Sequence, residues 1–130
     1  MAEEVQETLT DRNIESVLDD VKQYCGIEKE DNSFDADICG AIDTAMSTLC
    51  QLGVIKLENL KPVQNESLTW SSFLTDPIQL AMAKQYVKIK VRLMFDPPAS
   101  GTVRAALEEQ ADEYEFRAQF AAEYPCKSEI

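Results

Sequence analysis

The chain has 130 residues, 45% hydrophobic and 28% charged, which is the composition of one globular domain of ordinary size. Acidic residues outnumber basic ones 24 to 12, and the net charge of −12 argues against a protein whose main task is to bind nucleic-acid phosphates. Histidine is absent and no apolar run approaches the roughly 20 residues that cross a bilayer, so composition predicts a soluble acidic domain that is not an enzyme.

The first predicted helix runs from Thr10 or Asp11 to Cys25. Either of the first two residues can cap its start, and Gly26 can adopt the left-handed backbone that ends a helix. Its apolar residues recur at spacings of three and four, which places them on one face: Ile14, Val17, Leu18, Val21 and Tyr24. Residues 1–9 form a leader that we expect to be flexible, and its acidic start is unlike a signal peptide.

A second helix is predicted from a cap at Asp35 to about Leu52, with Gly53 as its stop. Its apolar stripe consists of Ile38, Ile42, Ala45, Met46, Leu49 and Leu52. Asp31, Ser33, Asp35 and Asp37 stand at the first, third, fifth and seventh positions of a calcium-loop pattern. However, Ala36 and Ile42 replace the glycine and the glutamate that this loop needs, so we interpret Asp35 as a helix cap.

Residues 54–69 lack helical periodicity and predict one long loop. Val54 to Leu57 can be extended, and a loop of this length in a compact domain often carries a binding role. Thr69 or Ser71 can then start a short helical turn that holds Trp70, Phe73 and Leu74. We expect Trp70, the only tryptophan, to anchor the core rather than an interface.

The third long helix is the best-marked element. Asp76 is its predicted cap, Pro77 suits the first helical position, and Asp96-Pro97-Pro98 ends the helix after Phe95. Apolar residues occupy most of its circumference, so the helix should be central and covered on several sides. Lys84, Lys88 and Arg92 fall four apart and form one basic stripe, with Lys90 off it.

A last helix is predicted from about Val103 to Glu123, with Ser100 or Thr102 as its cap. One apolar stripe consists of Val103, Ala106, Leu107, Ala111, Tyr114, Ala118 and Ala121. Phe116 and Phe120 extend the apolar surface to a second side, which either wraps the core or is buried against another copy or a partner. Residues 124–130 should be flexible in the isolated chain.

The four cysteines, Cys25, Cys39, Cys50 and Cys126, form no C-x-x-C pair, and we interpret them as small buried apolar side chains in a reducing compartment. The charge is distributed in blocks: the net charge is −9 over residues 1–37, +2 over 38–104 and −5 over 105–130. These blocks offer opposite-sign surfaces that could meet between copies, or solvated helix faces.

Motifs for catalysis or metal binding fail. Acidic pairs at 108–109 and 112–113 fit a solvated helix face, and no nucleophile has a histidine to activate it. The four glycines form no phosphate loop, and Asn65-Glu66-Ser67 matters only in a secreted protein. We therefore predict no catalytic residue, no metal site and no cofactor.

Three segments resemble the bacteriophage head–tail connector, or adaptor, family, whose members are also described as phage DNA packaging proteins. They are residues 37–45 (DICGAIDTA) with Leu52-Gly53-Val54, residues 70–76 (WSSFLTD) and residues 83–98 (AKQYVKIKVRLMFDPP). The last is the most characteristic, and the resemblance spans roughly residues 35–120. The acidic first 30 residues depart from the family pattern.

The resemblance implies a single all-α connector domain, a small bundle of four main helices over residues 1–130. It also implies a ring of about a dozen copies in the virion that docks on the portal protein, extends the DNA channel without binding DNA specifically and accepts a tail terminator or stopper protein. We expect no membrane contact, and host cytoplasm as the site of assembly.

Residues are assigned to these roles as hypotheses. The subunit-interface candidates are Lys84, Lys88, Arg92, Arg104, Phe116 and Phe120. The core anchors are Trp70, Tyr86, Leu93 and Phe95, and the portal-docking tail contains Tyr124, Pro125, Cys126 and Ile130, ordered on docking. Two other classes stay open: an acidic DNA mimic that inhibits a basic host protein, and a metal-dependent enzyme.

Overall fold

The computed structural model describes residues 14–124, and the regular elements of this part of the chain are helices joined by loops. This confirms the predicted all-α class. Its elements are α2 (Val17–Tyr24), α3 (Asp35–Gln51), the single-turn 3-10 helices η1 (Leu57–Asn59) and η2 (Trp70–Ser72), α4 (Pro77–Phe95) and α5 (Gly101–Glu123). None of the described helices combines the length and the apolarity needed to span a bilayer.

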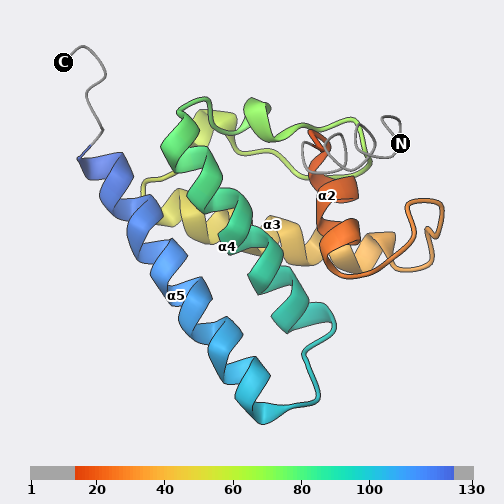
Figure 1. Ribbon diagram of the computed structural model, residues 1–130. Helices are drawn as coiled ribbons and strands as arrows, with labels where there is room; N and C mark the ends of the chain where they lie inside the picture. The colour runs from red at the N-terminus through yellow and green to blue at the C-terminus, as the bar shows by residue number, and fades with distance from the viewer. Residues whose placement is uncertain (1–13, 125–130) are drawn as a thin grey trace, which may run out of the picture.

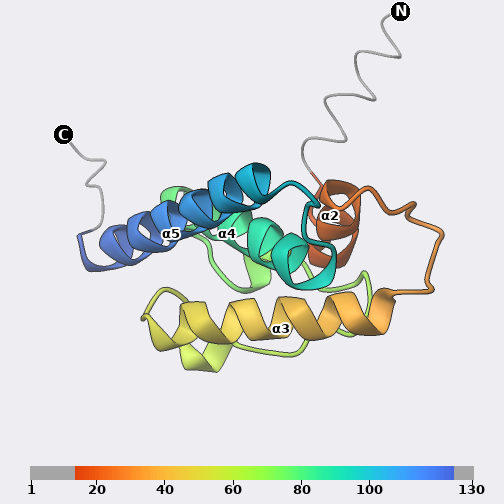
Figure 2. The same ribbon diagram turned by 90° about the horizontal axis from the view of Figure 1, so that it is seen from below.

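The helices form three layers with α4 in the middle (Figures 1 and 2). Helix α5 lies on one side of α4, helix α3 on the other, and α2 sits beside α4. The central position of α4 confirms the expectation for a helix that is apolar on most of its circumference. Its fully buried residues are Ala83, Tyr86, Val87, Ile89 and Val91.

The core is shared unequally among the helices. Helices α2, α3 and α4 and the loop after α3 supply nearly all of the buried side chains, with Trp70 and Phe73 from the η2 turn. Helix α5 contributes two buried residues, Ala111 and Ala118. Its packed face begins at Leu107, because Val103 and Ala106 from the predicted stripe are exposed. Most of the surface of α5 therefore remains free of contacts within the chain.

Most predicted helix ends are confirmed by their capping contacts. The Asp76 carboxylate accepts a hydrogen bond from the Gln79 amide at 2.9 Å, and the Ser100 hydroxyl accepts one from the Val103 amide at 3.3 Å. Gly26 and Gly53 follow α2 and α3 with φ of 78° and 83°, the left-handed conformation expected at these stops.

The start of the first helix was predicted too early. Thr10 and Asp11 lie outside the described residues, but residues 14–16 are not helical, and α2 begins at Val17 with Ser16 as its cap. The cause is pairing with a distant segment: the Trp70 amide donates to the Glu15 carbonyl at 3.0 Å, and the Val17 amide donates to the Leu68 carbonyl at 3.1 Å. A short antiparallel bridge thus replaces the first helical turns.

Two further local predictions were wrong. Asp35 is not the cap of α3; Phe34 holds that position without a side-chain bond, and Asp35 lies in the first turn, 3.0 Å from the Lys22 amine. The buried Lys22 charge needs an anion, which draws Asp35 away from capping. The segment after Gly53 is not extended: it bends, buries Val54 and Ile55, and continues into η1.

Candidate assembly surface

A row of exposed aromatic side chains runs along the last third of α5. Phe116, Phe120 and Tyr124 are 65%, 52% and 62% exposed, although side chains of this size are normally buried. Their rings are close neighbours, with centroids 6.0 Å apart for the first pair and 4.8 Å apart for the second. The spacing of four residues places all three on one face of the chain at the end of α5.

A groove lies between this aromatic row and the first turns of α4. Its volume is about 310 Å³, and we call it the aromatic groove. Most of its lining is apolar, with one acid and one base: Asp76, Ile78, Met82, Phe116, Arg117, Phe120, Ala121 and Tyr124. Ile78 is 41% exposed there, so the groove is open to a partner.

The predicted basic stripe on α4 faces other parts of the same chain. The Lys88 amine lies 3.2 Å from the Asp20 carboxylate of α2, and Asp20 also accepts a hydrogen bond of 2.9 Å from the Trp70 indole N–H. The Lys84 amine lies over the Trp70 ring, 5.9 Å from its centroid. These contacts tie α4 to α2 and η2.

The other two basic interface candidates differ in their surroundings. Arg92 is half-buried, and its Nε atom is buried without a hydrogen-bond partner in the described chain. Its positive charge lowers the pKa values of Tyr24 and Cys25 at the end of α2, against the larger rise that burial causes. Arg104, in contrast, is exposed in the first turn of α5.

A buried lysine that sequence reasoning missed holds the loop between α2 and α3. Lys22 is 1% exposed, and its amine pairs with Asp35 at 3.0 Å and donates to the Lys29 carbonyl at 3.0 Å. Asp31 accepts a hydrogen bond from the Ser33 amide within the same loop. Of the acids in the calcium-like pattern, Asp31 therefore stabilises the loop and Asp35 pairs with Lys22. The described residues contain no cluster suited to a metal ion.

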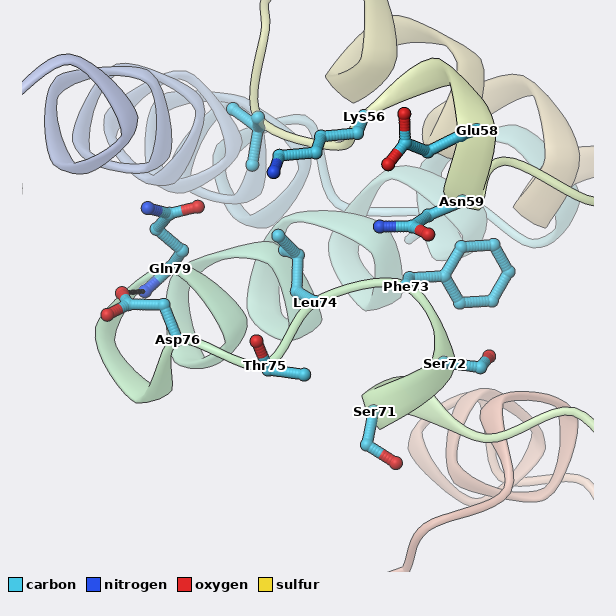
Figure 3. A pocket seen from close by; sticks show the side chains of 11 residues that line it. Lys56, Glu58, Asn59, Ser71, Ser72, Phe73, Leu74, Thr75, Asp76 and Gln79 are labelled. Atoms are coloured by element: carbon cyan, nitrogen blue, oxygen red, sulfur yellow. Dashed lines mark hydrogen bonds between the residues drawn. The ribbon is translucent and has the colours of Figure 1, made fainter.

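A second, polar pocket lies beside the start of α4 and shares Asp76 with the aromatic groove (Figure 3). It has a volume of about 350 Å³ and lies between the segment from Val54 to Asn59 and the segment from Ser71 to Gln79. Lys56 and Glu58 approach it from the first segment, and Asp76 and Gln79 from the second (Figure 3). Its lining offers charges and hydroxyls but no nucleophile with an adjacent base.

The described cysteines are free thiols. Cys39 is buried, as predicted, whereas Cys25 and Cys50 are half-buried. Burial raises the pKa of Cys25 to about 11 and also raises that of Cys39, so neither forms a reactive thiolate near neutral pH. Cys126 lies outside the described residues.

The remaining predicted residues lie as follows. Trp70 and Tyr86 are each 1% exposed in the core, whereas Leu93 and Phe95 are half-buried at its edge. Phe95 contacts the ring of Phe34 edge-on, with centroids 5.4 Å apart. Of the predicted portal-docking tail, only Tyr124 is described; Pro125, Cys126 and Ile130 lie outside the described residues.

Comparison with known proteins adds one finding. The family model described as "Phage connector protein" matches residues 17–125, which include every helix of the described structure. No curated protein and no solved structure matches the chain.

Proposed function

The chain belongs to the phage connector protein family, and we propose from this premise that its copies form a homo-oligomeric ring between the portal vertex and the tail. The family assigns it the role of a phage structural connector. In the proposed role the ring extends the DNA channel and completes the head after packaging, and the protein acts by assembly rather than by catalysis.

The exposed aromatic row supports this proposal most directly. Phe116, Phe120 and Tyr124 form a continuous apolar surface on α5 that nothing in the described chain covers. Contiguous exposed apolar surface of this kind usually marks a protein–protein contact. A closed ring needs a heterologous contact, in which two different surfaces of each copy meet. We propose that α5, including the exposed Arg104, supplies one of these surfaces.

The basic residues of α4 support the interface proposal less than the aromatic row of α5 does. Lys88 forms an ion pair with Asp20 and its side chain is only 17% exposed, and Lys84 covers Trp70. Using them between copies would break contacts that hold α2 on α4. The proposed subunit interface therefore centres on α5.

Acidic residues on α5 suit a surface that faces DNA without binding it. Glu108, Glu109, Asp112 and Glu113 are all exposed. We propose that part of this acidic surface lines the channel, where it repels the DNA phosphates so that the duplex slides through. A cryo-EM map of the ring would contradict this proposal if lysine and arginine lined the channel.

Electron microscopy of the protein mixed with portal particles tests the ring. We expect a ring of about a dozen copies on the portal. Phe120→Ser should prevent ring formation, because it removes an aromatic side chain from the proposed interface. The matched control is Met94→Ser, which removes a similarly exposed apolar side chain from the end of α4, outside α5, and should leave the ring intact.

Deletion of residues 125–130 tests the proposed docking tail in the same assay. It should abolish attachment to the portal while leaving the circular dichroism spectrum of the domain unchanged. Normal attachment of the shortened chain would contradict the docking role. Absence of any ring, together with competition with DNA for a basic host protein, would favour the DNA-mimic hypothesis instead.

A further inference from the structure

Leu57 is the most exposed large hydrophobic residue of the described chain. It is 76% exposed at the start of η1, a single-turn helix in which no residue is buried. Its sequence neighbours Lys56 and Glu58 are exposed and carry opposite charges. We call this exposed segment the Leu57 knob; its apolar centre is Leu57, and its two charged residues, Lys56 and Glu58, also line the polar pocket.

The Leu57 knob and the aromatic groove lie on different faces of the molecule. In Figure 2, η1 (yellow-green) lies on the α3 side of the three layers, whereas α5 forms the opposite side. Leu57 does not line the aromatic groove of its own chain. Two neighbours can therefore occupy the knob and the groove of one copy at the same time.

The knob and the groove are complementary in size and chemistry. The groove volume of about 310 Å³ is roughly ten times the ~30 Å³ share of one water molecule in the liquid, so a leucine side chain fits. Its walls are aromatic and aliphatic, which suits a leucine. Its rim carries one acid, Asp76, and one base, Arg117, opposite in sign to Lys56 and Glu58 respectively. Asp76 also caps α4, and Arg117 pairs with Glu113 at 2.9 Å; that pair is more than half exposed, so it is weak and can exchange partners.

We propose that the Leu57 knob of one copy inserts into the aromatic groove of the next copy. The contact is head-to-tail, and its repetition closes into a ring when the rotation between copies permits. The inference rests on the proposed function, because it supplies the contact by which connector copies assemble. It also gives the long loop a role, since the loop carries the knob.

Mixing two variants of the full chain tests this contact. Leu57→Asp destroys the knob and keeps the groove, whereas Phe120→Asp destroys the groove and keeps the knob. Each variant alone should sediment as a monomer under conditions in which the unaltered chain associates. Their equimolar mixture should form dimers and nothing larger, because one intact knob meets one intact groove. Both positions are more than half exposed, so the fold should survive, and circular dichroism checks this.

The size of the effect can be measured with a milder change. Leu57→Ser should weaken self-association by roughly 10- to 100-fold, the factor that corresponds to burial of one leucine side chain. Met94→Ser, at an exposed apolar residue of α4 outside the knob and the groove, should leave association unchanged. The inference is overturned if the variant mixture stays monomeric while the unaltered chain associates, or if Leu57→Asp alone associates normally.

A photo-crosslinking amino acid at position 57 gives a second measurement, made on rings assembled on the portal. A crosslink to residues 113–124 of another copy supports the inference. Rings that form without this crosslink, or that form normally with Leu57→Asp, overturn it while leaving the proposed function intact. Failure of the unaltered chain to form rings on the portal overturns the proposed function; if it then also fails to self-associate in solution, the inference falls with it.

Discussion

Asp20 and Lys22 are charged residues within one helical turn, yet they are only 6% and 1% exposed. Each is satisfied by partners from other elements: Lys88 and the Trp70 indole for Asp20, and Asp35 for Lys22. A buried charge is tolerated only when it is paired and hydrogen-bonded. These residues therefore fix how α2 docks on α4 and α3.

Their positions in the sequence already indicate that both side chains lie near the buried face of α2. Asp20 follows Val17 by three residues and Lys22 follows Leu18 by four, so both fall close to the apolar stripe of α2. The partners could not have been predicted, because Trp70 and Lys88 are 50 and more positions away in the chain.

Removing the partner of Asp20 should be costly. Lys88→Met keeps the length of the side chain but leaves the Asp20 carboxylate buried with only the Trp70 hydrogen bond. We expect the free energy of unfolding to fall by about 2–3 kcal/mol, near the lower end for a broken buried ion pair. Urea denaturation measures this change.

The control is Lys29→Met, because Lys29 lies 3.8 Å from Asp19 and is 71% exposed. An exposed pair contributes little, so this change should shift stability by less than about 0.5 kcal/mol. Equal effects of the two variants would show that the Asp20–Lys88 pair does not stabilise the docking of α2.

Tyr86 should make stability sensitive to alkali. Burial, and then the negative charge of Glu115, raise the pKa of Tyr86 from 10.0 to about 12. The unfolded chain releases this proton near pH 10 and the folded chain only near pH 12, so stability should fall as pH rises through this window. Absorbance of tyrosinate should show late ionisation, and Tyr86→Phe should reduce it; the part that remains belongs to Tyr24, whose pKa burial also raises. A single step near pH 10 for all tyrosines would contradict this assignment.

At the scale of the element, local sequence signals predicted the helices well wherever those signals acted alone. The proline and aspartate pairs around α4 place both of its ends correctly, and Ser100 places the start of α5. The start of α2 failed because pairing with residues 68–70 competes with helix formation. The cap of α3 failed because Asp35 pairs with a buried lysine.

Substitution by alanine should change the free energy of unfolding in opposite directions at Gly40, inside α3, and at Gly53, just after it. Gly53 has a φ of 83°, so Gly53→Ala should lower the free energy of unfolding by about 1–2 kcal/mol. Gly40 lies exposed inside α3, so Gly40→Ala should raise it by about 0.5–1 kcal/mol. At both positions an added Cβ meets open space, so the backbone alone decides the sign. Thermal unfolding of both variants checks this, and equal signs would contradict it.

At the scale of the whole molecule, the sequence predicted the all-α class and the central place of α4 but not where the opposite charges meet. The acidic first block and the basic centre were expected either to meet between copies or to form solvated helix faces. In the structure they also meet inside one copy, at Asp20–Lys88. The surfaces that remain free for neighbouring copies depend on how α2 packs against α4. This packing cannot be predicted from the net charges of sequence segments.

The candidate surface was predicted only in part. Phe116 and Phe120 stood out because they lie off the main apolar stripe of their helix, and the structure places both on the exposed face of α5. Ile78 and Met82 were expected to be covered as part of an apolar helix, and they line the aromatic groove instead. Leu57 gave no signal, because a lone leucine in a polar loop fits no periodicity.

Helix α5 leans almost entirely on α4 and touches little else. Within the described chain, it is joined to the rest by the short connection from Asp96 to Ser100. No residue that lines the aromatic groove belongs to the buried core. The groove and the enclosed interior are therefore built from separate sets of side chains, and a change in one need not disturb the other.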